Sequence, residues 1–99
     1  PIAQADIFAP LLMVIPYTSQ SDAIAKLSSS PYALTATLFG PEFEAKKWLP
    51  MIRAGSVCIN DIIAPTADPE LPFGGLGESG YGVTRGAEGL LEMTHPQSI

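Results

Sequence analysis

Residues 1–60 alternate short apolar runs with amphipathic stretches, and this alternation limits most strongly what the chain can fold into. The uninterrupted apolar run at 11–15 is bounded by prolines and is typical of a strand buried on both faces. Residues 34–39 and 56–60 have the β-branched and apolar composition of two further strands. Because strands separated by helical segments are joined by parallel crossovers, we predict an α/β fold that begins with a parallel βαβαβ segment.

The segments between these strands predict two helices. The first should begin near Ser19 or Ser21, because a hydroxyl there can accept hydrogen bonds from free backbone N–H groups. The second should begin at Pro41, because proline suits the first turn of a helix. Pro50 lacks a backbone N–H and crowds the preceding turn, so it should kink or end this helix. We expect Gly55 to form the C-terminal cap that follows.

Turn residues dominate the second half of the chain. Residues 61–86 hold six of the nine glycines and three of the ten prolines. We therefore predict a Gly/Pro-rich loop over 61–83, followed by a helix and a short tail over 84–99. The glycines lack the Lys-Ser/Thr pair of a phosphate-binding loop, so close packing and positive backbone φ angles explain them better.

The composition predicts a segment of a larger hydrophobic interior. Apolar residues make up 46% of the chain and charged residues 15%, so the chain is more hydrophobic and less charged than an independent domain of average composition. A chain of 99 residues buries only somewhat more than about 60% of its unfolded surface, which gives a thin core for a complete enzyme. We therefore expect further sequence to cover the predicted parallel sheet, which needs both faces buried.

Charge and cysteine content argue against several classes of partner. The net charge of −5 makes nucleic acid an unsuitable partner, because phosphate binding requires a basic surface. No apolar run approaches the roughly 20 residues needed to span a bilayer, so we expect no membrane partner. The single cysteine cannot form an internal disulfide, which permits a reducing compartment, and the cytoplasm is the default expectation.

A series of short motifs runs along the whole chain. The motifs are Asp6-Ile-Phe-Ala-Pro10, Ser30-Pro-Tyr-Ala-Leu34, Ala54-Gly-Ser-Val-Cys-Ile-Asn60, Leu71-Pro-Phe-Gly-Gly75, Glu78-Ser-Gly-Tyr-Gly82 and Gly86-Ala-Glu-Gly-Leu90. In order and spacing they resemble the C-terminal part of the catalytic domain in the aldehyde dehydrogenase superfamily. The resemblance implies a fragment of its three-layer fold, with a βαβαβ segment at 1–60, a substrate-tunnel and Gly-rich loop at 61–83, and a helix and tail at 84–99.

The resemblance also implies a reaction, the NAD(P)-dependent oxidation of an aldehyde to a carboxylic acid. In this family a cysteine thiolate attacks the aldehyde, hydride passes from the thiohemiacetal to the nicotinamide, and a glutamate-activated water hydrolyses the thioester. The cysteine, the glutamate and the cofactor domain lie upstream of the segment that this chain resembles. The resemblance therefore implies no catalytic residue here, NAD or NADP bound mainly by the missing part, and an inactive isolated fragment.

The same resemblance assigns candidate binding residues. Asp6 and Phe8 correspond to a glutamate that accepts hydrogen bonds from the nicotinamide ribose and to an aromatic residue beside the cofactor, although Asp6 is one methylene shorter. Phe73 corresponds to an aromatic residue near the aldehyde entrance, and Asp61, Ile62 and Ile63 to the variable loop of the same tunnel. An apolar tunnel of this kind would favour hydrophobic aldehydes, whereas simple core or loop packing is the alternative role for these apolar residues.

Three further residues are better explained by structure than by chemistry. Cys58 lies within the third predicted strand, where a buried thiol is inert, and it does not align with the family's nucleophile. His95 has no partner Cys, Asp or Ser at a recognisable spacing, and no spacing in the chain predicts a metal site. Asn60 ends a predicted strand, where a turn or capping role is expected.

Two other functions are compatible with the sequence. The chain could be a non-catalytic oligomerisation or binding remnant that associates through its apolar surface. It could also belong to a reductase relative of the same superfamily, which works through a cysteine-bound acyl group. For the enzyme, the resemblance implies an aldehyde as substrate and a homo-oligomer, either a dimer or a tetramer.

Overall fold

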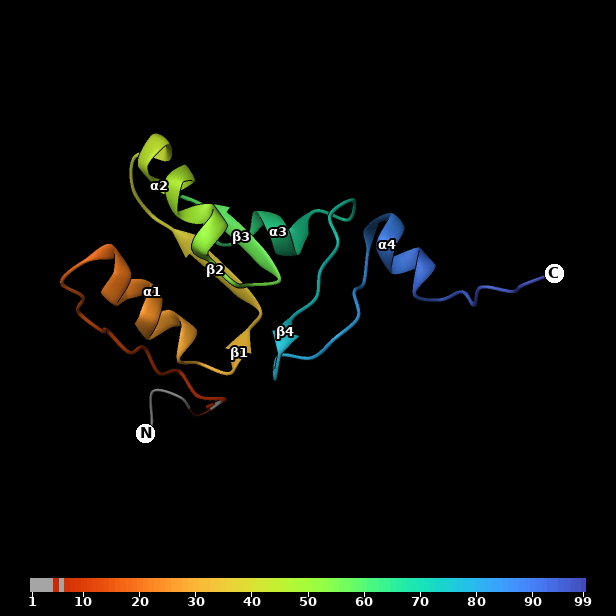
Figure 1. Ribbon diagram of the computed structural model, residues 1–99, viewed down its shortest axis with the longest axis horizontal. Coiled ribbons are helices and arrows are strands. Elements are labelled where there is room, and N and C mark those ends of the chain that lie inside the picture. The colour runs from red at the N-terminus through yellow and green to blue at the C-terminus, as the bar shows by residue number, and fades with distance from the viewer. Residues whose placement is uncertain (1–4, 6) are drawn as a thin grey trace. The chain divides into compact units, whose positions relative to one another are not determined.

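The computed structural model describes residue 5 and residues 7–99, and the chain divides into two compact units, Pro1–Pro31 and Tyr32–Ile99 (Figure 1). The first unit contains one helix among its described residues, α1 (Gln20–Ser28). The second unit contains every strand that the structure describes, together with the remaining helices. The residues predicted to contact substrate therefore belong to the second unit, and Phe8 belongs to the first.

Helix α1 begins as its sequence predicts. The Ser19 hydroxyl accepts a hydrogen bond from the backbone N–H of Asp22 at 3.2 Å, which satisfies one of the free donors in the first turn. The Lys26 ammonium lies 2.8 Å from the Asp22 carboxylate, one helical turn away. The prediction of a helix that starts at Ser19 or Ser21 is confirmed, because Ser19 is the N-cap.

The prediction of a buried strand at 11–15 is wrong. Residues 11–17 have no regular secondary structure, and Leu12 and Val14 are each 85% exposed. A strand needs a neighbour that pairs with its backbone N–H and C=O groups, and the described part of this unit contains only α1 as a regular element. The apolar run therefore has the composition of a buried strand, but the described part of its unit offers no strand that could pair with it.

The second unit is built from short elements in the order strand, strand, helix, strand, helix, strand, helix. These are β1 (Tyr32–Ala33), β2 (Thr35–Leu38), α2 (Glu42–Trp48) with the 3-10 turn η2 (Leu49–Met51), β3 (Ser56–Ile59), α3 (Ala64–Ala67), β4 (Leu76–Gly77) and α4 (Gly86–Leu91). The strand pairs are β1 with β4, antiparallel, and β2 with β3, parallel. The predicted terminal helix is present as α4, and an extended tail follows it (Figure 1).

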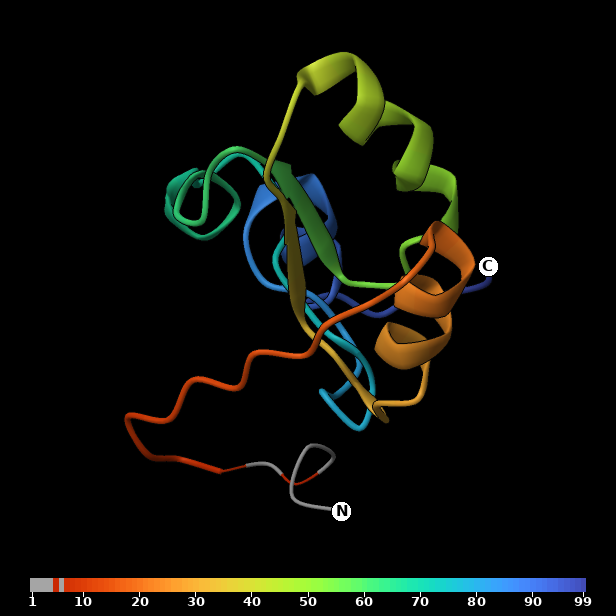
Figure 2. The same ribbon diagram turned by 90° about the vertical axis from the view of Figure 1, so that its left-hand side faces the viewer.

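The parallel pair of β2 and β3 is the scaffold of this unit. Its register places Thr35 opposite Ser56, and the pairing continues in step to Leu38 opposite Ile59. Figures 1 and 2 both show the two strands side by side, with α2 in the connection between them. The α/β class and the parallel crossover are thus confirmed, but the predicted βαβαβ segment is reduced to one βαβ unit because the first strand is absent.

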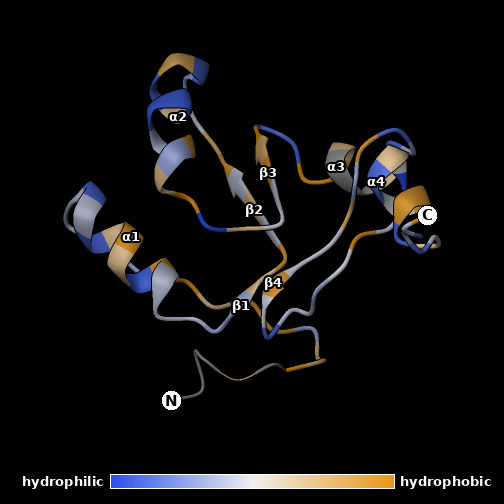
Figure 3. Cartoon of the chain, turned by 45° about the vertical axis from the view of Figure 1, so that its right-hand side comes forward, coloured by the Kyte–Doolittle hydropathy of each residue, from blue (hydrophilic) through white to orange (hydrophobic). Residues whose placement is uncertain are grey.

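Helix α2 ends where proline forbids its continuation. The α-helix stops at Trp48, and Pro50 lies in the 3-10 turn that follows, as the missing N–H of proline predicts. Ala45 is buried on the face of α2 that packs inward, and the acidic and basic side chains of the helix remain exposed. Figure 3 shows this mixture of hydrophobic and hydrophilic residues along α2.

Gly55 has a different role from the predicted helix cap. It has no positive φ, and the helical segment already ends at Ile52, which has an extended backbone with φ −86° and ψ 120°. A Cβ atom at Gly55 would instead overlap the backbone carbonyl group of Gly74. The cap prediction is therefore wrong, and a close approach between two backbone segments explains this glycine.

Few side chains are buried within the described part of the chain. Ala33 and Ala45 are the buried apolar residues, whereas large side chains such as Phe39, Phe43 and Leu90 are exposed. The thin core that the composition predicts is therefore observed. Burial of this exposed apolar surface against other protein would be favourable in free energy.

Candidate functional site

The predicted cofactor residues lie in the first unit. Asp6 falls outside the residues that the structure describes. Phe8 lies in the irregular segment before α1, and its side chain is 98% exposed. Core packing, the alternative role for Phe8, is therefore wrong in this structure, and its ring is open to an external partner.

The predicted substrate loop begins at the carboxyl end of β3 with an asparagine in a left-handed conformation. Asn60 has φ 56°, a region that asparagine tolerates better than most residues. Its side-chain amide donates to the Gly40 carbonyl oxygen, and its Oδ1 accepts from the Gly40 N–H, both at 2.9 Å. The side chain of Asn60 thus links the ends of β2 and β3, which confirms the predicted turn role.

Asp61 organises the next turn. Its Oδ1 accepts hydrogen bonds from the backbone N–H groups of Ile63 at 2.7 Å and Ala64 at 3.2 Å. The Thr37 hydroxyl on β2 donates to the Asp61 carbonyl oxygen at 3.0 Å. The backbone hydrogen bonds from Ile63 and then Ala64 hold the pKa of the Asp61 carboxyl below its usual range, because they stabilise the ionised form.

Ile62 and Ile63 follow directly and project from this ordered turn. Their side chains are 67% and 62% exposed, so neither is consumed by packing within the described chain. The short helix α3 begins after them at Ala64. The structure therefore places two adjacent apolar side chains at the surface, on a turn with a defined backbone.

Phe73 lies in the later part of the loop, on a separate backbone bridge. Phe73 and Thr84 exchange two backbone hydrogen bonds of 2.8 Å, and the Thr84 hydroxyl donates to the Phe73 carbonyl oxygen at 3.3 Å. The Arg85 guanidinium lies 5.2 Å from the centre of the Phe73 ring, a cation–π geometry. Phe73 is thus held in place and partly buried, and its contact with substrate stays a prediction.

Gly74 and Gly75, which follow Phe73, are closely packed, whereas Gly80 has open space beside it and a positive φ. A Cβ atom at Gly74 would overlap the backbone carbonyl oxygen of Gly82, and one at Gly75 would lie 2.5 Å from the Ser79 side chain. At these two positions neighbouring parts of the loop leave no room for a side chain. The sequence interpretation that close packing explains these glycines is confirmed.

Cys58 and His95 occupy the structural positions expected of them. Cys58 lies within β3, opposite Thr37, and is partly buried beside a cavity of about 310 Å³. His95 is exposed in the tail after α4.

Over residue 5 and residues 7–99, no group of three or more His, Cys, Asp or Glu side chains is placed to hold a metal ion. Within the same residues, no helix has the length and apolar character of a membrane span.

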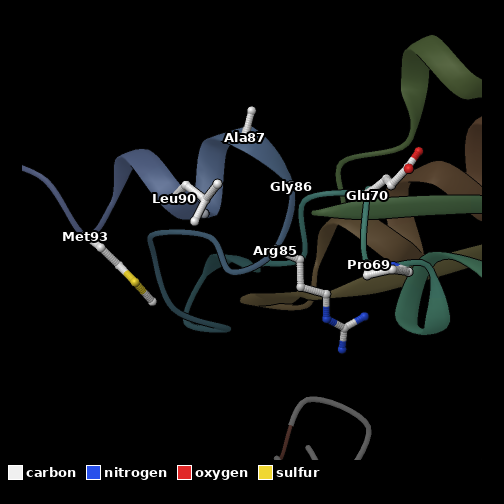
Figure 4. A pocket seen from close by; sticks show the side chains of 8 residues that line it. Pro69, Glu70, Arg85, Gly86, Ala87, Leu90 and Met93 are labelled. Carbon is white, nitrogen blue, oxygen red and sulfur yellow. The ribbon is translucent and has the colours of Figure 1, made fainter.

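One cavity was not indicated by the sequence. It lies beside α4 and has a volume of about 650 Å³. Figure 4 shows Leu90 and Met93 on one side of it and Pro69 and Glu70 on the other, with Arg85 beside them. None of the predicted substrate residues lines this cavity. The sequence offers no signal for it, because its walls come from separate parts of the loop and from α4.

Comparison with known proteins identifies the family. The profile of the aldehyde dehydrogenase family matches residues 1–99. The chain is 36% identical over 99 residues to the "Probable coniferyl aldehyde dehydrogenase" of Pseudomonas aeruginosa, which covers 99% of this chain and 21% of that protein. It is 36% identical over 98 residues to the 4,4'-diaponeurosporen-aldehyde dehydrogenase of Staphylococcus aureus, covering 98% of this chain and 21% of that protein.

Solved structures give the same result for the fold. An aldehyde dehydrogenase of Mycobacterium tuberculosis complexed with NAD⁺ matches 95% of this chain and 19% of its own with a TM-score of 0.86 and 38% identity. An aldehyde dehydrogenase of Pseudomonas syringae in complex with NAD⁺ and octanal matches 92% of this chain and 18% of its own, with a TM-score of 0.81 and 37% identity. The chain belongs to the aldehyde dehydrogenase family, and it spans about a fifth of the length of these relatives.

Proposed function

We propose that these 99 residues are part of an NAD(P)-dependent aldehyde dehydrogenase. In the proposed reaction an aldehyde, NAD(P)⁺ and water give a carboxylic acid, NAD(P)H and a proton. The observation that carries the proposal is the family match over residues 1–99, together with the backbone likeness to a relative complexed with NAD⁺. The cysteine nucleophile, which forms the thiohemiacetal and then the thioester, belongs in this proposal to sequence outside the chain.

Cys58 is not a candidate for that nucleophile. It lies within β3, partly buried, with its backbone paired to β2. A catalytic thiol needs a neighbouring base or positive charge and access to the substrate. His95, the only histidine in the sequence, lies beyond α4 in the tail. These positions support a structural role for Cys58.

The chain's contribution to cofactor binding is proposed to be limited to Phe8 and Asp6. The nicotinamide of the bound cofactor supplies a hydride acceptor in this chemistry. The exposed ring of Phe8 fits a packing contact with such a flat ring system. The loop lacks the Lys-Ser/Thr pair of a phosphate-binding loop, which supports the assignment of NAD or NADP mainly to sequence outside this chain.

The substrate side of the site is proposed to include Ile62, Ile63 and Phe73. The two exposed isoleucines and the partly buried ring would bind a substrate through its hydrocarbon part and help to exclude water from it. Several relatives are named for apolar aldehydes, coniferyl aldehyde and diaponeurosporen-aldehyde among them, and one neighbour was crystallised with octanal. These names support hydrophobic aldehydes as the substrate class.

The test uses the full-length polypeptide, meaning the product of the complete open reading frame that contains this chain. It is incubated with octanal, an aromatic aldehyde or propanal and with NAD⁺ or NADP⁺. We expect reduced nicotinamide and the matching carboxylic acid to form in equal amounts. The absence of both products with every aldehyde and either cofactor would contradict the proposal. Cys58→Ser should keep the activity, and its loss would show that the nucleophile is assigned wrongly.

A non-catalytic association module is the second candidate function, because large apolar side chains are exposed over both units. The reductase relative is a variant of the first candidate, in which the cysteine-bound acyl group is the substrate for reduction by NAD(P)H. Assays of the full-length polypeptide in both directions distinguish the three. An association module would show self-assembly in sedimentation without any redox activity. For the enzyme we propose a dimer or a tetramer, which the same measurement tests.

A further inference from the structure

The backbone that carries Ile62 and Ile63 is held by hydrogen bonds from three separate groups. The Asn60 amide links it to Gly40 after β2, and the Thr37 hydroxyl links it to β2 itself. The Asp61 carboxylate then accepts the N–H groups of Ile63 and Ala64. Because these bonds act at Asn60, Asp61, Ile63 and Ala64, on both sides of Ile62, few alternative conformations remain for the turn.

This degree of order contrasts with the exposure of the two side chains that the turn carries. Exposed apolar residues are common on protein surfaces, so exposure alone assigns no role to the two isoleucines. Here two adjacent isoleucines, 67% and 62% exposed, lie between the Asp61 carboxylate and the first turn of α3, so side-chain and helical hydrogen bonds together fix their backbone. A contact surface that is ordered before binding loses less entropy when the ligand arrives.

We propose that Asp61 is a positioning residue for substrate selection, which orients Ile62 and Ile63 toward the hydrocarbon part of an aldehyde. The inference rests on the proposed function of the chain as part of an aldehyde dehydrogenase. Asp61 touches neither substrate nor cofactor in this proposal. It acts through the backbone N–H groups that its carboxylate accepts, and Thr37 supports it from β2.

The charge state of Asp61 suits this role. The two backbone hydrogen bonds lower the pKa of its carboxyl, so the group is ionised at neutral pH and acts only as an acceptor. An ionised acceptor makes shorter and stronger hydrogen bonds to N–H groups than a neutral one. An asparagine at this position keeps an acceptor oxygen in the same place, and an alanine removes it.

The experiment compares Asp61→Ala with the wild-type full-length polypeptide on octanal and propanal. We expect KM for octanal to rise about three- to tenfold while kcat and KM for propanal stay the same, because contacts to added methylenes are worth about tenfold or more. Asp61→Asn should restore KM for octanal to within about twofold of wild type, because its oxygen still accepts the two N–H groups. A defect that affects both aldehydes equally would overturn the proposal.

Asp68→Ala is the matched control. Asp68 lies in the same loop and also accepts a backbone N–H, that of Glu70, at 2.9 Å. Its removal takes away the same kind of bond from a turn that carries no exposed isoleucine pair. We expect the ratio of KM for octanal to KM for propanal to stay at the wild-type value, and an equal rise in both variants would overturn the proposal.

Two further measurements complete the test. One does not depend on activity, and the other uses a second variant in case Asp61→Ala does not fold. Hydrogen exchange at the N–H groups of Ile63 and Ala64 should quicken roughly two- to tenfold in Asp61→Ala, as expected for one lost hydrogen bond at each. Thr37→Val should raise KM for octanal in the same direction by a smaller factor. Unchanged hydrogen exchange in Asp61→Ala would overturn the positioning role. A wild-type polypeptide that is inactive on every aldehyde would instead overturn the proposed function, and the exchange result would remain valid.

Discussion

The two ends of the β2–β3 pair are held by opposite means. At the amino end, Gly55 and Gly74 approach so closely that a Cβ on Gly55 would overlap the Gly74 carbonyl group. At the carboxyl end, the Asn60 side chain makes two hydrogen bonds of 2.9 Å to Gly40. The first end depends on the absence of side-chain atoms, and the second depends on the presence of a particular side chain. The amino end should therefore tolerate no added side-chain atom at Gly55. The carboxyl end should lose stability by an amount that depends on which residue replaces Asn60.

Gly55→Ala should have the largest effect. The overlap is with backbone, which no rotamer change relieves, so we expect a cost of about 3 kcal/mol or more. Native-state hydrogen exchange of the β2 and β3 amides in the full-length polypeptide measures this local stability. Gly40→Ala is the control, since φ is 150° but no atom lies within 4 Å of the added Cβ. Its backbone strain should cost about 1 to 2 kcal/mol, and equal costs at both sites would contradict the steric account.

Replacements of Asn60 should have the next largest effect. Asn60→Ala loses both hydrogen bonds to Gly40 and places an ordinary residue at φ 56°, so we expect a cost of about 2 to 3 kcal/mol. Asn60→Gly loses the same bonds without the strain and should cost about 1 to 2 kcal/mol. The same exchange measurement gives both values. If the glycine variant is as unstable as the alanine variant, conformational strain is not part of the role of Asn60.

The contrast between these ends also shows how much the sequence could predict. The capping role of Ser19, the stop at Pro50 and the turn conformation of Asn60 are local features, and local chemistry was enough to predict them. The partner of Asn60 was not predicted, because Gly40 lies 20 residues away across a strand pair. Gly55 was misinterpreted for the same reason, since its neighbour Gly74 comes from the loop.

The prediction of a strand at 11–15 was wrong for a related reason, because an apolar run specifies burial but not the strand that pairs with it.

The candidate site likewise combines features that the sequence could predict with features that it could not. The resemblance to the family selected Ile62, Ile63 and Phe73, and the structure adds the bonds that orient them. The hydrogen bonds that the Asp61 carboxylate accepts from the N–H groups of Ile63 and Ala64 could have been expected, because aspartate after a strand commonly forms such a turn. The bond from Thr37 could not, since it depends on the parallel register of β2 and β3.

Acid should distinguish the two ends, because one contains a titrating group and the other does not. The pKa of Asp61 is lowered in the folded chain, so its hydrogen bonds add stability that is complete above the ordinary value of 3.8. This contribution is lost as pH falls below that value and through the lowered folded pKa. Exchange at Ile63 should therefore quicken on acidification more than at Ser56 beside Gly55, once the intrinsic pH dependence is removed. Asp61→Asn should abolish the difference, and a difference that persists in this variant would contradict the assignment.

The smallest effect should come from the ion pair of Glu42 and Lys46 on α2, which lies in the connection between the two ends. The two side chains are more than half exposed, and water and salt screen a pair of this kind. Lys46 lowers the pKa of Glu42 first through a hydrogen bond and then through its charge. Glu42→Gln should therefore leave the thermal unfolding midpoint and the exchange rates at Gly55 and Asn60 within experimental error. A measurable change at either end would mean that α2 transmits strain to the strand pair, and that the two ends are not held independently.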